Sequence, residues 1–85
     1  MRQILHILKS ENDLYTLPII RNACSDNRIK ILLIQEATQR VIDLAEAAIF
    51  VLSDDLKQGC KTPHEKIGYE GMLDLIFMSD SVIIW

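Results

Sequence analysis

A hydrophobic run at residues 28–35, Arg-Ile-Lys-Ile-Leu-Leu-Ile-Gln, lies at the centre of the predicted fold. Five of its eight residues are Ile or Leu, and they do not alternate cleanly with polar residues. That pattern is typical of a strand that is covered on both faces. Asn27 before the run and Glu36 after it leave a strand's length rather than a helix's. We expect this run to be the central strand of a parallel sheet.

Shorter apolar runs on either side of the central run predict the remaining strands. They occupy residues 3–8, 47–52 and 81–85, with a minimal strand near Ile67.

The segments between these runs carry helical signals. Thr-Leu-Pro at 16–18 can begin a helix, because Thr can cap free amides and Pro is tolerated in a first turn. Residues 36–45 have apolar positions spaced as in an amphipathic helix of about three turns. Ser53 and the two Asp residues after it predict a capped, brief helix that ends at Gly59.

A last helix is predicted over residues 70–78, with Met72, Leu75 and Ile76 on one face. Strand and helix then alternate along the whole chain. This order predicts an α/β fold over residues 1–85: one small three-layer domain with a mainly parallel sheet of four to five strands and right-handed crossovers.

Composition and charge narrow the class of protein. The chain has 85 residues, of which 49% are hydrophobic and 25% charged, as in a soluble globular domain. A chain of this size buries only about 60–65% of its unfolded surface, so we expect assembly with other subunits to add stability. The net charge is −3 and the basic residues are scattered from Arg2 to Lys66, which argues against direct binding to nucleic acid.

The expected location is the cytoplasm. No signal-peptide pattern opens the chain, and no apolar segment approaches the ~18 residues that span a membrane. The two cysteines are too few for a disulfide framework, and free thiols fit a reducing compartment.

Cofactor and metal motifs are missing from the sequence. The only glycines are Gly59, Gly68 and Gly71, so neither a Gly-rich turn after the first strand nor a phosphate-binding loop is present, and we expect no cofactor. Cys60 and His64 could supply at most two of the three or four ligands that zinc needs, so we expect no metal.

Each cysteine allows two interpretations. Cys60 lies in a predicted loop near Lys57, Lys61 and His64, and positive neighbours favour the thiolate that attacks sulfur. The interpretation we favour is a surface cysteine without function. Cys24 falls on the apolar face of its helix, where it is either a small core residue or a nucleophile.

Other polar or aromatic residues also leave alternatives open. His6 is either a hydrogen-bonded structural histidine or part of a site at the sheet. Asp54 and Asp55 could pair for acid–base chemistry, but helix capping explains them better. Trp85 could pack in the core or against another subunit.

Several stretches, read together, resemble the DsrH/TusB family, the small subunits of the DsrE/DsrF/DsrH and TusB/TusC/TusD sulfur-relay complexes. The similarity runs nearly end to end and in the same order. The stretches are Ile4-Leu5-His6 with Lys9-Ser10, Ile31-Leu32-Leu33-Ile34-Gln35, Val51-Leu52-Ser53-Asp54-Asp55-Leu56-Lys57, Tyr69-Glu70-Gly71-Met72-Leu73-Asp74-Leu75, and the terminal Trp85.

This resemblance implies a hetero-oligomer with DsrE/TusD-like and DsrF/TusC-like partner subunits. In that family persulfide sulfur passes between cysteines, towards tRNA wobble-uridine 2-thiolation or towards sulfur oxidation. The main sulfur-carrying cysteine belongs to the DsrE/TusD-type subunit. DsrH proteins of sulfur oxidisers carry another in the first helix, whereas TusB proteins lack it. That position falls on Ile20 here, with Cys24 one turn later.

The working hypothesis is a non-catalytic or weakly catalytic subunit that scaffolds a cysteine-bearing partner in a cytoplasmic sulfur relay. If the chain carries sulfur itself, Cys60 is chemically the better candidate and Cys24 the better aligned. The alternative is a stand-alone homo-oligomer that binds a small ligand at the carboxyl ends of its strands, near Ser53 and Gln35.

Overall fold

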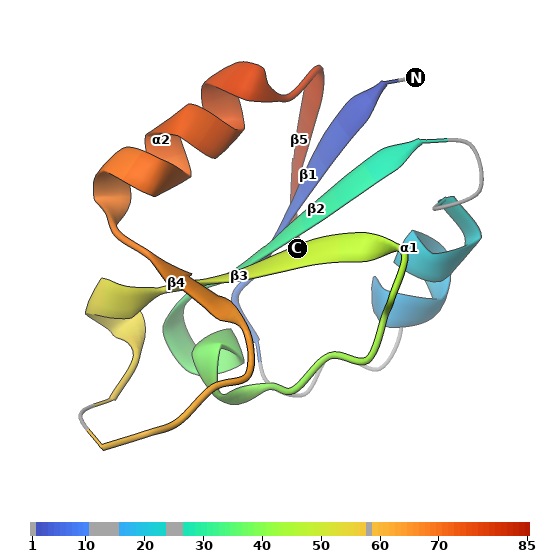
Figure 1. Ribbon diagram of the computed structural model, residues 1–85. Helices are drawn as coiled ribbons and strands as arrows, with labels where there is room; N and C mark the ends of the chain where they lie inside the picture. The colour runs from blue at the N-terminus through green and yellow to red at the C-terminus, as the bar shows by residue number, and fades with distance from the viewer. Residues whose placement is uncertain (1, 11–15, 24–26, 58) are drawn as a thin grey trace.

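Strand β2 (Arg28–Leu33) lies in the middle of a five-stranded sheet in a computed structural model that describes residues 2–10, 16–23, 27–57 and 59–85. The strands follow the order β4-β3-β2-β1-β5, and every pair is parallel (Figure 1). Hydrophobic clusters cover both faces of β2, with Ile29, Ile31 and Leu33 in one and Leu32 in the other, which explains its apolar run. The predicted central strand is confirmed.

The remaining elements follow the predicted alternation of strand and helix. They are β1 (Gln3–Leu8), α1 (Thr16–Ala23), the 3₁₀ helix η1 (Gln35–Gln39), β3 (Ala47–Leu52), the 3₁₀ helix η2 (Ser53–Asp55), β4 (Glu65–Ile67), α2 (Tyr69–Met78) and β5 (Ser81–Ile84).

Two hydrophobic clusters, one on each face, hold the sheet between its helices. On one face, α1 and η1 contribute Ile20 and Ala37 to a cluster with β1, β2 and β3. On the other, Leu75 of α2 packs on alternate residues of the same strands, including Leu5 and Leu32. Figure 1 shows α2 on one side of the sheet and α1 on the other. The fold is therefore a three-layer α/β domain.

Gly71 sets how closely α2 approaches the sheet edge. A Cβ at this position would lie 2.9 Å from Cβ of Ile67 in β4, closer than carbon atoms pack. The missing side chain lets the helix turn back directly over the short strand that precedes it.

The helix predicted over residues 36–45 is wrong. Only η1 forms, and Arg40 is already extended, with ψ at 142°. Beyond it, exposed Val41 and Asp43 alternate with buried Ile42 and Leu44, which is the pattern of an extended segment. β-Branched residues favour that conformation, and the amide of Ile42 donates a hydrogen bond to a distant side chain instead of to a helix.

The capped helix predicted from Ser53 is also wrong in detail. η2 has only three residues, and Leu56 after it is extended, with ψ at 126°. The residue before η2 is Leu52, and no side chain caps the amides of η2. The hydroxyl of Ser53 donates to the neighbouring Asp54 Oδ1 instead, at 3.4 Å.

In the described residues, no helix is both long and apolar enough to cross a membrane.

Candidate functional site

The carboxyl end of β2 is closed by a polar network within the chain. Gln35 has a left-handed backbone, with φ at 51°, and its amide donates to Asp55 Oδ2 at 2.9 Å. The hydroxyl of Thr38 donates to the carbonyl of Gln35 at 2.8 Å. Asp55 is thus neither an acid–base partner of Asp54 nor a cap of its own helix, because its carboxylate joins η2 to the start of η1.

This end of the sheet offers little to a small ligand in the described part of the chain. The side chains of Ser53 and Gln35 are exposed, and no pocket is found among the described residues. Nor do those residues include a group of three or more metal-binding side chains. No described feature favours the ligand-binding alternative.

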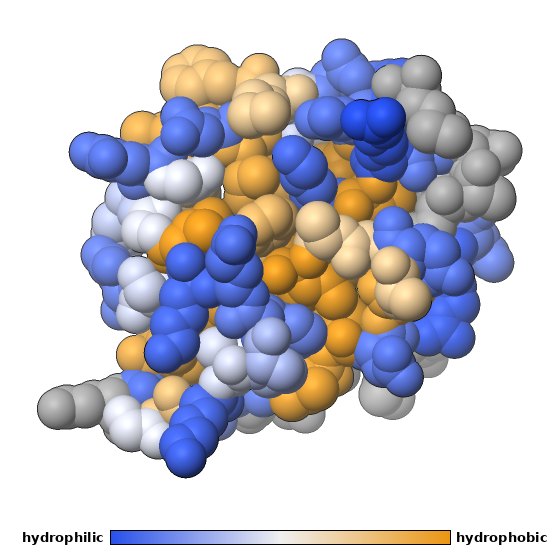
Figure 2. All heavy atoms as spheres, viewed as in Figure 1, coloured by the Kyte–Doolittle hydropathy of each residue, from blue (hydrophilic) through white to orange (hydrophobic). Residues whose placement is uncertain are grey.

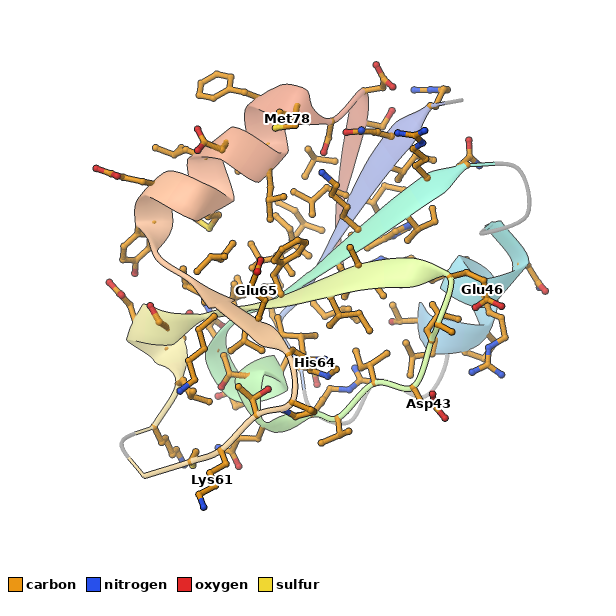
Figure 3. All side chains as sticks on the ribbon, in the orientation of Figure 1. Asp43, Glu46, Lys61, His64, Glu65 and Met78 are labelled. Carbon is orange, nitrogen blue, oxygen red and sulfur yellow. The ribbon has the colours of Figure 1, made fainter. Side chains whose placement is uncertain are left out.

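The side chain of His64 is hydrogen-bonded to the backbone of the extended segment after η1. Its Nε2 accepts the hydrogen bond from the Ile42 amide, at 3.1 Å, so this nitrogen carries no proton. Burial lowers the pKa of His64 below its usual 6.5, because the imidazolium is poorly solvated there. Figure 3 shows His64 beside this segment, well below α2. Its role is structural, and it forms no described site with Cys60.

His6 and Trp85 form a buried polar pair across the β1–β5 ladder. The indole Nε1–H of Trp85 donates to His6 Nδ1 at 3.0 Å, and the two rings stack at 6.0 Å between centroids. His6 is 3% exposed, and its Nε2 is buried without a hydrogen-bond partner among the described residues. Burial lowers the pKa of His6, so the ring is neutral with its proton on Nε2.

Trp85 therefore belongs mainly to the fold. It packs against the hydrophobic cluster on the α1 side of the sheet, and its amide donates to the carbonyl of Ile7 at 2.9 Å. Of the two interpretations of this residue, the structure supports the core one.

Of the two candidate sulfur carriers, only Cys60 lies among the described residues. Cys60 is half-buried and free, in the segment between η2 and β4, and its amide donates to the carbonyl of Lys57 at 3.0 Å. Cys24 lies outside the described residues.

Helix α2 has two apolar faces, of which only one is covered. Met72, Leu75 and Ile76 pack towards the sheet, as predicted. Tyr69, Leu73 and Phe77 recur every four residues on the outer side, where they are 52%, 49% and 83% exposed. A helix that is apolar nearly all round is normally covered on both sides.

Strand β5 also exposes apolar side chains, at the edge of the sheet and on the side that α2 covers. Val82 and Ile84 pair with Leu5 and Ile7, which places them on the α2 side of the sheet, and Ile84 is 63% exposed. The outer edge of β5 pairs with no described strand. Natural edge strands usually carry a charge, a proline or a bulge, whereas the core of this strand is Val-Ile-Ile.

We call this region the α2/β5 surface, defined by its exposed apolar residues. Figure 2 shows apolar side chains gathered over α2 at the top of the view, and Figure 3 places Met78 at the end of the helix. The surface consists of Tyr69, Leu73, Phe77, Met78, Val82 and Ile84.

The exposed apolar stripe of α2 has a signal in the sequence that the predictions above do not use. Residues 69–78 contain only two charged side chains, Glu70 and Asp74, so the helix cannot present a polar outer face.

No protein-family model matches this chain, and no curated protein matches it. The structure itself shows a small three-layer α/β domain with a parallel sheet. Its most distinctive described feature is the exposed apolar α2/β5 surface. The resemblance to the DsrH/TusB family rests on the residues quoted above.

Proposed function

We propose that this chain is a subunit of a cytoplasmic sulfur-relay complex and scaffolds DsrE/TusD-like and DsrF/TusC-like partners. The relay would serve tRNA wobble-uridine 2-thiolation or sulfur oxidation. In this proposal the chain assembles the complex and performs no catalysis of its own.

The α2/β5 surface is the observation that carries the subunit role. Seven of the nine large apolar side chains that are exposed among the described residues lie in α2 and β5, namely the six that define the surface and Ile83. Exposed apolar side chains concentrated in this way mark a protein–protein interaction site. The kind of complex follows from the end-to-end resemblance in sequence, with which the parallel α/β fold agrees.

The surroundings of Cys60 and the residue at the family's cysteine position support the passive role. In a persulfide relay the acceptor thiolate attacks the outer sulfur of the donor persulfide, a new S–S bond forms, and the donor cysteine leaves as a thiolate. Such a step needs a thiolate that the donor can reach. Cys60 is half-buried, and its one described hydrogen bond is that of its amide. The resemblance puts Ile20, not a cysteine, at the family's sulfur-carrying position.

A pull-down from the native host tests this proposal. The tagged chain is recovered with and without a thiol-blocking reagent, and the intact masses of all recovered chains are measured. We expect DsrE-like and DsrF-like chains, with one extra sulfur on the partner's cysteine and none on Cys24 or Cys60.

Two other results would contradict the proposal. Recovery of this chain alone, as a homo-oligomer without added sulfur, would refute the sulfur-relay role and favour the ligand-binding alternative. Added sulfur on Cys24 or Cys60 would refute the passive role and make this chain a carrier.

A further inference from the structure

The charged side chains of helix α2 are both negative. Glu70 and Asp74 are exposed and stand one turn apart beside the stripe of Tyr69, Leu73 and Phe77. No Lys or Arg follows Lys66 in the chain. The apolar stripe of α2 is therefore bordered by two negative side chains, and α2 carries no basic residue to balance them. At the β5 end, the guanidinium of Arg2 donates to Ser81 Oγ.

A second copy of this chain fits the α2/β5 surface poorly. A symmetric dimer through this surface would bring Glu70 and Asp74 of both copies towards the same interface, and like charges there cost binding energy. A head-to-tail contact would need another apolar face. Outside the α2/β5 surface, only Ile19, Val41 and Ile83 are exposed large apolar residues among those described, and they lie on three different segments.

We infer that the α2/β5 surface docks a chain of different sequence, whose contact face is apolar and bordered by Lys or Arg. The apolar stripe supplies the buried centre of the interface, with Phe77 as its most exposed aromatic anchor. Glu70 and Asp74 supply complementary charge at the rim, which orients the partner and excludes self-association.

This inference rests on the proposed function, because it takes the DsrE-like and DsrF-like chains as the partner. Their purified complex is the probe. Its dissociation constant for the full-length chain is measured by titration calorimetry at low and at physiological salt, and sedimentation of the chain alone measures self-association.

The first variant removes the anchor. Phe77→Glu is expected to weaken binding at least about tenfold, because it places a charge in the apolar centre. Val41→Glu is the matched control, since Val41 is 72% exposed and distant from α2 in sequence, and it should bind within about threefold of the unmodified chain. Equal binding by Phe77→Glu and the unmodified chain would overturn the proposed surface.

The second variant reverses the rim charge. Glu70→Lys with Asp74→Lys should weaken binding about tenfold at low salt, with a smaller effect at physiological salt, because charges at a rim are screened. Unchanged or tighter binding would overturn the basic border of the partner. A homo-oligomer of the unmodified chain that Phe77→Glu dissociates would show that a second copy is the occupant.

The two proposals fail in distinguishable ways. If the unmodified chain does not bind the DsrE-like and DsrF-like complex at all, the proposed function fails, and this inference fails with it. The unmodified chain and Phe77→Glu can also bind the complex equally well and support sulfur transfer equally well. In that case only the assignment of the surface fails.

Discussion

At the scale of single residues, the pair His6 and Trp85 ties the last strand to the first. The hydrogen bond from the indole to the buried imidazole joins residues 79 positions apart. Trp85→Phe keeps an aromatic ring but leaves His6 Nδ1 without its donor. We expect the free energy of unfolding to fall by about 1–3 kcal/mol, as for other buried polar groups that lose a partner.

Urea denaturation of a double-mutant cycle measures this coupling. His6→Phe with Trp85→Phe should cost clearly less than the sum of the two single changes, since no polar atom of the pair remains buried and unpaired. Tyr69→Phe, which removes only an exposed residue's hydroxyl, is the control. Strictly additive costs would show that the bond contributes nothing.

The two histidines also predict how stability depends on pH. Burial lowers both pKa values below 6.5, so the unfolded chain binds protons at a higher pH than the folded one. Their contribution is complete above pH 6.5 and is lost as the pH falls through the folded-state values. Urea denaturation at pH 7.5, 6.5 and 5.5 should therefore show decreasing stability.

His64→Gln isolates one of the two contributions. The Gln side-chain carbonyl can accept the Ile42 amide at any pH, so this variant should lose less stability than the unmodified chain between pH 7.5 and 5.5. An identical decrease in both proteins would exclude His64 as a source of the pH dependence.

At the scale of elements, the short helices η1 and η2 depend on one carboxylate. Asp55 holds the amide of Gln35 at 2.9 Å, at a residue with a left-handed backbone that is unfavourable for Gln. Asp55→Ala should cost about 1–2 kcal/mol of unfolding free energy. Asp54→Ala, the matched neighbour, should stay within about 0.5 kcal/mol, and equal costs in thermal denaturation would contradict this role.

The strands could be predicted from the sequence because their signals are local. Residues 3–8 and 47–52 match β1 and β3 at both ends, since each is a short apolar run flanked by turns. The bounds of β2 were also close, except that Gln35 begins η1 instead of ending the strand. Burial on both faces gives such runs a simple pattern that needs no knowledge of partners.

The predictions that were wrong concern elements whose conformation depends on contacts between residues distant in sequence. Apolar positions in 36–45 fit a helix, but the acceptor for Ile42 is 22 positions away, on His64. The link between η1 and η2 spans 20 positions, from Gln35 to Asp55. Nothing local in the sequence reveals either partner. The outer apolar stripe of α2 could have been predicted from the sequence, because it depends only on the spacing of residues within one helix.

At the scale of the whole molecule, the chain divides its apolar residues between a core and an interface. The core fills both faces of the sheet, whereas α2 and β5 keep Phe77 and Ile84 exposed. Exposing these residues in a chain of 85 residues is costly for solubility unless a partner covers them. A scaffolding subunit is the kind of protein in which a partner does so.

This division of roles predicts that the thiols of the chain are dispensable. In the proposed complex, the partner supplies the sulfur-carrying cysteine. The double variant Cys24→Ser with Cys60→Ser should therefore assemble with the DsrE-like and DsrF-like chains as tightly as the unmodified chain. It should also transfer sulfur from a persulfide donor at a similar rate, as measured by mass spectrometry of the partner's cysteine.

The matched variant for that experiment changes the surface and leaves both thiols in place. Phe77→Glu should lose assembly and, with it, the sulfur transfer that depends on the assembled complex. If the cysteine-free chain assembles normally but transfer stops, a thiol of this chain lies on the relay path. In that case single Ser substitutions would distinguish Cys24 from Cys60, and the scaffold would also be a carrier.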